Sequence, residues 1–593
     1  MRSLTLSLCV LLAPAPTLHA ADDEAWWSLE QAEEVLERTR RVELAPDLAD
    51  LSPAARAAAD RLLEAGAILH ELYEESRHRE ALAARERLAT LPVTPAHRAA
   101  LEDLVYLFKG PIATTLDNER VPFLPVAPQP AGRNVYPWDV DRDSLEAWLA
   151  GDPARRSALL GVRTVVRATT AENLARDRAV LDAHPLLDGL HAGLRSRLDE
   201  LAAAASPDPF YALPYSVRWP DRTLRVHGLL ADAAAAIAPE DPDFADYLRL
   251  RALDLLTDDY EAGDAAWVSG DFGSLNAQIG SYETSDDALY GVKSFYSLSL
   301  LARDAARSDE LAAAIGGIQE IQDGLPQAGD RRVRERFPVG VYNVIADFGQ
   351  ARGANTATIL PNEADHTRKY GRTILLRYNI MTHPELFADS LAVYQAAVDP
   401  AFADDLTMDG NFYRTLWHEV GHYLGVAETN DGRTLDTALA PWGDLLEEMK
   451  ADLVSLHTVT RLAEQDVMDE AALRSVRASG VRRVLLRVRP RRDQPYGMMQ
   501  LMQFNFFLEE GLLGWDADTG RLGIDYDRYQ AVVEDMLGRV LALQAAGDPV
   551  AVEAFIERYG GWEEDLHGRL AERLRAATPY RFRMVRYRVL APL

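Results

Sequence analysis

The sequence predicts an α+β protein that is predominantly helical, and two observations support this prediction. Residues 29–107 are rich in Ala, Leu, Glu and Arg, and their apolar residues recur at helical spacing. Short runs rich in β-branched residues occur at 339–345, 356–360 and 373–376 and predict a small group of strands. The sheet should therefore be a minority component. A chain of 593 residues is long enough to fold as two or more lobes.

The first twenty residues are expected to be a signal peptide. Arg2 supplies a positive charge, residues 4–12 form an apolar run, and Ala20 precedes a plausible cleavage site. The run is too short to span a bilayer. Cys9, the single cysteine of the sequence, lies within it, so the mature chain would have no disulfide and no thiol nucleophile. We expect an exported protein, periplasmic or secreted, without a transmembrane helix.

The chain after the helical N-terminal part should contain loops, then further helices and strands. Residues 110–137 contain repeated Pro and Gly and are predicted to be loop and extended chain. Residues 143–146, Asp-Ser-Leu-Glu, are typical of a helix start. Residues 161–167 and 215–219 are predicted to be strands because they are rich in Val, Thr and aromatic residues.

The segment Trp417–His422, which reads Trp-His-Glu-Val-Gly-His, predicts a zinc site. Two histidines four residues apart project from one face of a helix, so both imidazoles can reach one metal. Glu419 lies between them and can reach a water at that metal. The alternative is an ordinary buried helix whose histidines bond to backbone or carboxylate groups.

A second helical segment, residues 445–456, offers a third ligand. Its apolar residues recur at helical spacing: Leu445, Leu446, Met449, Leu453 and Leu456. Glu448 and Asp452 lie four apart beside this apolar stripe, where carboxylates are costly to bury unless a cation or donors satisfy them. The stretch between His422 and Glu448 is long enough for one helix to end and a second to return a carboxylate to the metal. The fourth position would stay open for water.

The charge of the chain limits its partners. A net charge of −29 disfavours nonspecific binding to nucleic acid and to anionic membranes. Two basic runs, at 474–492 and 575–588, are interpreted as solvated surface that pairs with the acidic remainder rather than as carboxylate-recognition sites. A solvated charged flank is likewise the alternative for Glu447 and Lys450.

Together with three further segments, the two metal motifs resemble the dipeptidyl peptidase III family of zinc metallopeptidases, over nearly the whole mature chain. Residues 110–137 are similar to the family's Gly-Pro, Leu-Asp, Pro-Phe and Tyr-Pro run. Residues 279–293 are similar to its Ile-Gly, Glu-x-Tyr, Asp and Gly-x-Lys block, and residues 497–511 to a helix that borders its cleft. This chain has the five-residue form of the His-Glu motif, which some bacterial relatives share.

The resemblance implies two lobes separated by a wide cleft: a helical lobe that bears the zinc, and a mixed lobe with a small β-barrel. The chain would then divide into a signal peptide (1–20), the mixed lobe (21–303), the helical lobe (304–342), strands of the mixed lobe (343–388), the helical zinc lobe (389–575) and a C-terminal return to the mixed lobe (576–593).

The resemblance also implies one zinc ion with three protein ligands: His418, His422 and Glu448. Glu419 would be the catalytic base. Glu447 and Asp452 would contact the outer nitrogens of the ligand histidines, and such contacts orient a ligating imidazole.

Family positions for substrate binding are only partly matched. Glu283 and Asn362 match positions that hold the α-ammonium of a peptide. Ser285 replaces a cleft tyrosine and Ile359 replaces a substrate-binding asparagine. Tyr496 stands where the family has a histidine that stabilises the transition state, and a tyrosine hydroxyl can donate a hydrogen bond to an oxyanion.

The expected function is hydrolysis of peptide bonds in short peptides by a zinc-activated water, with Glu419 as general base. The resemblance implies release of N-terminal dipeptides. We expect a monomer with short peptides as partners, and neither nucleic acid nor an integral membrane association. Two alternatives remain: a catalytically weak zinc-containing protein that binds peptides, and a hydrolase of a non-peptide amide.

Overall fold

The computed structural model of the chain describes residues 26–117, 119–205, 207–315, 317–326, 331–333, 338–353, 355–361, 363–465, 467–492 and 494–590. The predicted signal peptide with Cys9, and the predicted substrate-binding residue Asn362, lie outside these described residues. Helices dominate the described chain and the sheets are small, which confirms the predicted fold class. No described helix has both the length and the apolar character needed to cross a membrane.

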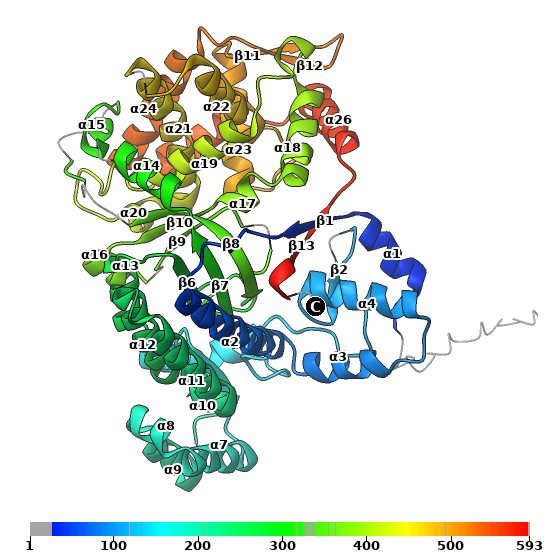
Figure 1. Cartoon of the computed structure of the whole chain (residues 1–593), viewed down its shortest axis with the longest axis vertical. Helices are drawn as coiled ribbons and strands as arrows, with labels where there is room; N and C mark the ends of the chain where they lie inside the picture. The colour runs from blue at the N-terminus through cyan, green and yellow to red at the C-terminus, as the bar shows by residue number, and fades with distance from the viewer. Residues whose placement is uncertain are drawn as a thin grey trace, which may run out of the picture.

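The main sheet lies between a large group of helices above it and a smaller group below it (Figure 1). Its strands pair in the order β6 (Leu275–Ser281), β7 (Tyr296–Arg303), β8 (Val339–Gly349), β10 (Thr373–Arg377) and β9 (Ala357–Leu360). All neighbours are antiparallel except β8 and β10, which are parallel. β6 and β9 stand at the two ends of this order, so the closed barrel implied by the resemblance is not shown by the described strands.

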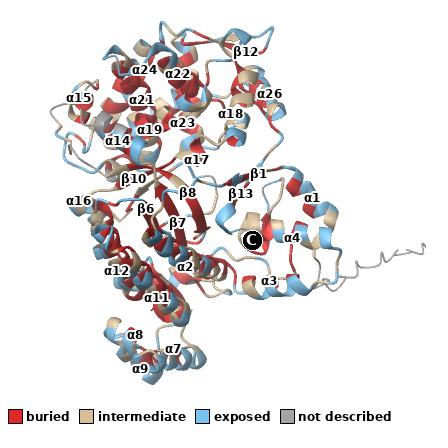
Figure 2. Ribbon diagram, in the orientation of Figure 1, coloured by how far each residue is buried: buried red, intermediate tan, exposed pale blue. Residues whose placement is uncertain are grey.

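The main sheet separates two hydrophobic cores and contributes side chains to both. Side chains alternate between the faces of a strand, and on β8 Val341 joins the core of the upper helices while Tyr342 joins the core below. On β10, Ile374 points to the upper core and Leu375 to the lower. Figure 2 shows the main sheet as buried, whereas the helices at the bottom of the view are largely exposed. The lobe bounds given above stay a prediction.

The upper core is built from helices of the C-terminal half together with two that precede β8. They are α14 (Ala305–Ile315), α15 (Ile318–Asp323), α17 (Tyr378–Met381), α18 (Pro384–Ala397), α19 (Met408–Gly421), α20 (Leu435–Leu439), α21 (Gly443–Glu464), α22 (Glu470–Arg483), α23 (Pro495–Glu509), α24 (Tyr529–Ala546), α25 (Pro549–Tyr559) and α26 (Arg569–Ala577), with the hairpin β11 (Leu513–Asp516) and β12 (Arg521–Ile524). The π-helical turn η2 (Glu564–Gly568) leads into α26, and the 3-10 turn η1 (Pro400–Phe402) follows α18.

The lower core is covered by long helices, of which α2 (Pro53–Arg77) packs directly on the sheet. A side chain at Gly66 of α2 would collide with the ring of Phe348 on β8, so the glycine allows this close approach. The other elements of this part are α5 (Arg142–Leu149), α6 (Pro153–Leu159), β4 (Thr164–Ala168), α7 (Ala171–Ala183), α8 (Pro185–Leu190), α9 (Leu194–Ala203), β5 (Phe210–Pro214), α10 (Tyr215–Arg218), α11 (Pro220–Ile237), α12 (Pro242–Thr257), α13 (Glu261–Ser269) and α16 (Ala364–Tyr370).

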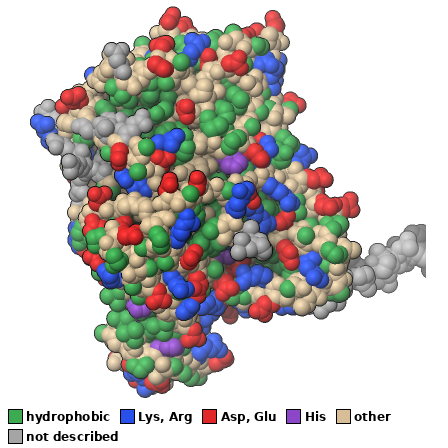
Figure 3. All heavy atoms as spheres, in the orientation of Figure 1, with side chains coloured by type: hydrophobic (Ala, Val, Ile, Leu, Met, Phe, Trp, Pro, Cys, Tyr) green, Lys and Arg blue, Asp and Glu red, His purple; other side chains and the backbone are tan. Residues whose placement is uncertain are grey.

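A third, smaller core joins the two ends of the described chain. The strand β1 (Thr39–Leu44) pairs in parallel with β13 (Phe582–Tyr587), and Met584 packs among N-terminal apolar residues. The remaining elements here are α1 (Leu29–Glu37), α3 (Ala81–Thr90), α4 (Pro95–Phe108), β2 (Ile112–Thr114), β3 (Arg120–Pro122) and the 3-10 turn η3 (Arg588–Leu590). Acidic and basic side chains are interspersed over the face in Figure 3.

The prediction of a strand at 215–219 is wrong. Residues Tyr215–Arg218 form the helical turn α10, and the strand ends just before it. The backbone N–H of Ser216, at the start of this turn, donates to Asp258 at 3.1 Å, and Asp258 follows α12. A side chain distant in sequence thus satisfies an amide that a strand would have paired, and local patterning contains no sign of it.

Candidate metal centre

The helix that carries the two histidines, α19, begins and ends at defined residues. Thr407 precedes it, and the Thr407 side chain accepts a hydrogen bond from the N–H of Gly410 at 3.2 Å. The helix ends at Gly421, and His422 is its C-cap residue with helical φ and ψ. A Cβ atom at Gly421 would lie 2.9 Å from the carbonyl oxygen of Ala451, so this glycine lets α21 pack close to the histidines.

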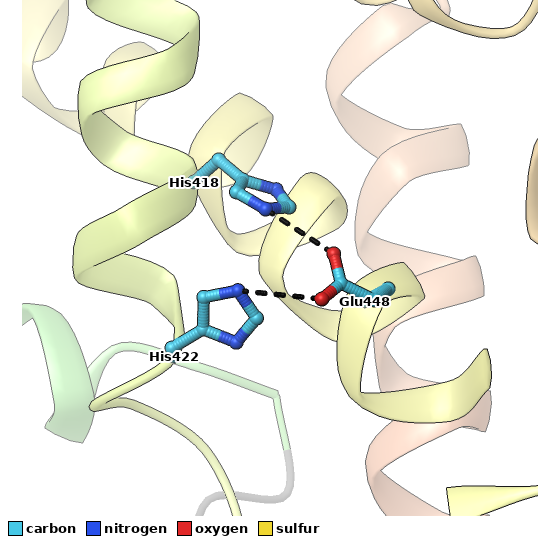
Figure 4. A group of neighbouring side chains, drawn as sticks. All are labelled: His418, His422 and Glu448. Atoms are coloured by element: carbon cyan, nitrogen blue, oxygen red, sulfur yellow. Dashed lines mark ion pairs between the residues drawn. The ribbon is translucent and has the colours of Figure 1, made fainter. Parts of the chain in front are cut away.

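The predicted ligands lie together (Figure 4). His418 Nε2 lies 3.4 Å from one oxygen of Glu448, and His422 Nε2 lies 3.9 Å from the other. Three ligand atoms on a tetrahedral zinc with bonds of 2.0–2.1 Å would be about 3.4 Å apart. Two imidazoles and one carboxylate form a common donor set for zinc. The described side chains therefore fit a single zinc ion.

The outer nitrogen of each histidine faces an acid. His418 Nδ1 lies 2.7 Å from Asp452 Oδ1, and His422 Nδ1 lies 2.9 Å from Glu447 Oε1. A proton held on Nδ1 leaves the lone pair of Nε2 free for a cation. Burial lowers the pKa of His418, but Asp452 outweighs it and raises that pKa to about 9. Metal binding must therefore displace a proton.

Two arginines form ion pairs with Asp452 and stabilise its negative charge. Arg414 Nη1 and Arg483 Nε donate to its two oxygens at 3.0 and 2.9 Å. Burial raises the pKa of this carboxyl, yet Arg483, His418 and Arg414 together hold it well below the usual range. The interpretation of 474–492 as solvated surface is wrong for Arg483, which points from α22 into the metal centre. Sequence reasoning missed both arginines.

Lys450 ties the end of α19 to α21. The Lys450 side chain is 1% exposed, and its ammonium donates to the carbonyls of Gly421 and Leu424 at 2.8 and 2.9 Å. It also lies 2.8 Å from Glu447 Oε1, the atom that contacts His422. A solvated flank is therefore the wrong interpretation for Lys450, which satisfies carbonyls left open where the helix ends.

The remaining predicted residues of the centre are Glu419 and Tyr496. Glu419 is partly buried on α19, between the two histidines. Tyr496 lies in the first turn of α23, and its hydroxyl donates to Glu448 Oε1 at 3.0 Å. Burial and Glu448 raise the pKa of Tyr496 well above its usual value, so the hydroxyl keeps its proton at neutral pH.

The charges around the centre favour a divalent cation. The carboxylates outnumber the cations by one, the carboxylates being Glu419, Glu447, Glu448 and Asp452 and the cations Arg414, Lys450 and Arg483. Without a metal, protonated His418 supplies the fourth positive charge. Once His418 releases that proton, one negative charge is left next to the three ligand atoms, and a cation can balance it.

The predicted substrate-binding residue Glu283 lies elsewhere: it is exposed and belongs to the segment after β6 rather than to the ligand helices. Its backbone carbonyl accepts a hydrogen bond from Phe295 at 3.2 Å. Ser285 Oγ, close by, accepts one from Gln350 at 3.3 Å. Ile359 lies on β9, opposite Ile374.

A second group with metal-ligand chemistry, which sequence reasoning missed, consists of Asp264, Glu363 and His366. His366 Nδ1 lies 2.8 Å from Asp264, and Arg251 donates to Asp264 at 2.6 Å. Arg163 forms an ion pair with Glu363. Because a guanidinium already neutralises each carboxylate, this group does not need a metal.

Two solved structures with this fold are dipeptidyl peptidases III. The structure of the enzyme from Caldithrix abyssi superposes with a TM-score of 0.79 at 22% identity, covering 94% of this chain and 99% of that one. The enzyme from Corallococcus sp. strain EGB gives a TM-score of 0.73 at 23% identity, covering 95% and 98%. This chain therefore has the dipeptidyl peptidase III fold.

Sequence comparison is less informative. No family model matches the chain. A curated relative, Nudix hydrolase 3 of Arabidopsis thaliana, is 23% identical over 440 residues, which cover 73% of this chain. The match spans only 54% of the plant protein, about half of its length.

Proposed function

We propose that this chain is a zinc-dependent peptidase that hydrolyses peptide bonds of short peptides. The observation that carries the proposal is the convergence of His418, His422 and Glu448, with Glu419 beside them, in a chain with the dipeptidyl peptidase III fold. The donor set favours zinc, and the similarity to dipeptidyl peptidases III supports a peptide substrate.

Each residue of the centre has a distinct task in this proposal. When bound, zinc supplies a Lewis acid that acidifies a water molecule and polarises the scissile carbonyl. Glu419 accepts the proton of the attacking water and delivers it to the leaving amine. Asp452 and Glu447 hold the ligand imidazoles in orientation. Tyr496 donates a hydrogen bond to the developing oxyanion.

Release of N-terminal dipeptides is the finer part of the proposal. It requires groups that capture the α-ammonium of the peptide, and we assign this task to Glu283 and Asn362 because they match the family positions. Ser285 and Ile359 replace neighbouring family residues, so the preferred residues of the substrate are expected to differ from those of the family. We further propose that the protein is exported, as residues 1–20 suggest.

The test compares wild type with Glu419→Gln on dipeptidyl-naphthylamides and on N-blocked peptides. We expect wild type to cleave only substrates with a free amino terminus, and the variant to lose at least about 100-fold in kcat while it keeps its zinc. Cleavage of blocked peptides alone would exclude the dipeptidyl specificity, and full turnover by the variant would exclude Glu419 as base. Bound zinc and bound peptide without turnover would indicate the weakly catalytic peptide-binding protein.

A further inference from the structure

A partly buried charged cluster lies away from the metal centre, where the ends of α2 and α4 meet the segment after β6. Its middle is Asp286, whose Oδ2 accepts a hydrogen bond from the Tyr73 hydroxyl at 2.8 Å. Arg77 Nε, at the end of α2, lies 3.3 Å from Asp286 Oδ1. Arg133 Nε donates to the backbone carbonyl of Asp286 at 2.9 Å. Two arginines thus reach one aspartate from different segments.

Two further cations complete the cluster. Lys109, the C-cap residue of α4, donates to the carbonyl of Gln350 at 3.0 Å, and the Gln350 side chain donates to Asp286 Oδ2 at 3.0 Å. Arg120, on β3, donates to Gln129 at 3.0 Å. The Gln129 side chain in turn donates to the backbone carbonyl of Arg77 at 3.0 Å, which places Arg120 beside Arg77.

The cluster holds more positive than negative charge. Among the described residues, the carboxylate of the cluster is Asp286. The four cations of the cluster are Arg77, Lys109, Arg120 and Arg133. Of the two neighbouring acids on α2, Glu74 is engaged by Arg85 at 2.7 Å, and Glu75 forms ion pairs with Arg218 and Arg222. An excess of positive charge therefore remains where Arg77 is only 6% exposed.

The excess positive charge disfavours the protonated forms of the cations in the cluster. Burial, followed by the charge of Arg77, lowers the pKa of Lys109 to about 7. Burial, followed by Arg77 and Arg133, lowers the pKa of Arg120 to about 10. Lys109 and Arg133 also adopt left-handed backbone, with φ of 56° and 54°, which is uncommon for residues other than glycine. The fold thus brings these cations together although they repel one another and although two of them adopt an unfavourable backbone conformation.

We infer that this cluster is a binding site for a multiply charged oxyanion of the phosphate type. Guanidinium forks match the geometry of phosphate oxygens, and a dianion offsets the excess charge better than one carboxylate does. Lys109 uses only one of its three N–H donors in the contacts above, and Arg120 is exposed, so an anion can enter from solvent. The site contains no metal ligand, and Gln350 links it to Ser285, in the same segment as the proposed substrate-binding Glu283.

The experiment titrates the full chain with inorganic phosphate by calorimetry, at constant ionic strength, with acetate and chloride as comparison anions. We expect saturable binding of one phosphate per chain, with acetate at least about tenfold weaker. Arg120→Gln and Lys109→Gln should each weaken phosphate binding about tenfold or more, because each removes a charge-assisted hydrogen bond. Arg61→Gln is the matched control, since Arg61 is an exposed residue of α2.

Thermal unfolding of the same variants separates binding from folding. Without phosphate, Arg120→Gln should unfold at the wild-type temperature or above it, because repulsion is relieved, and phosphate should raise this temperature less than in wild type. Equal phosphate binding by wild type and both cluster variants would overturn the inference, and would also be the result if phosphate bound only at the metal centre. Equal effects of phosphate, acetate and chloride would overturn it as well.

Discussion

Replacing Lys450 by methionine should destabilise the metal centre without touching a ligand. Methionine has a similar length but no donor, so the carbonyls of Gly421 and Leu424 and the carboxylate of Glu447 lose one partner each. Leaving the two carbonyls without their buried donor costs about 1–3 kcal/mol each, and a lost contact around a ligand weakens metal affinity by about 10- to 100-fold. We expect losses of this size in the free energy of unfolding and in zinc affinity.

The assay combines urea unfolding of the metal-free protein with competition for zinc against a chromophoric chelator. Lys369→Met is the matched control, because Lys369 is 55% exposed and contacts only Glu261 among the ion pairs of the described residues. An exposed pair contributes at most about 1 kcal/mol. If Lys450→Met changed stability by less than about 1 kcal/mol and left zinc affinity intact, the coupling of this ammonium to His422 would be refuted.

Three further predictions test other parts of the structure. Gly421→Ala should force α19 away from Ala451, lower the free energy of unfolding by about 1–3 kcal/mol and weaken zinc binding. The control is Gly228→Ala on α11, where a Cβ meets open space, and this change should be neutral or stabilising. Equal effects of the two substitutions in thermal unfolding would contradict this reasoning. Tyr496→Phe should lower kcat by about 100-fold while zinc stays bound, and unchanged kcat would remove the oxyanion role. Burial raises the pKa of Asp258 to about 7, so the folded state keeps a proton that the unfolded state releases, and wild-type stability falls as pH rises from about 4 to 7. Asp258→Asn should therefore stabilise by about 1 kcal/mol or more at pH 8 and by less at pH 5, and a gain independent of pH in denaturant titrations would count against this assignment.

The ligands of the metal centre could be predicted because their pattern is local. His418 and His422 lie one helical turn apart, and Glu448 stands on a second helix with its own apolar stripe. Arg414 and Arg483 could not be assigned in this way. Arg414 reaches Asp452 because α19 packs against α21, and Arg483 reaches it because α22 packs there as well. Both contacts depend on tertiary packing rather than on local spacing.

The fold, like the metal centre, was predictable where its sequence patterns are local. The strands β8, β9 and β10 lie where β-branched runs predict them, but β1 was hidden inside a helical composition because its partner β13 lies at the other end of the chain. β6 and β7 were also missed, since Ile279 is the single β-branched residue in the two strands. β8 and β10 are as deeply buried, but their β-branched residues identify them.

The most direct test of the central claim is the zinc dependence of product formation. Wild-type protein of measured zinc content would be incubated with a mixture of short peptides, and the products identified by mass spectrometry before chelation, after it and after zinc is returned. The account predicts one zinc per chain and release of N-terminal dipeptides that stops on chelation and resumes with zinc. Cleavage that continues unchanged in the metal-free protein, or no cleavage by the zinc-loaded protein, would contradict it.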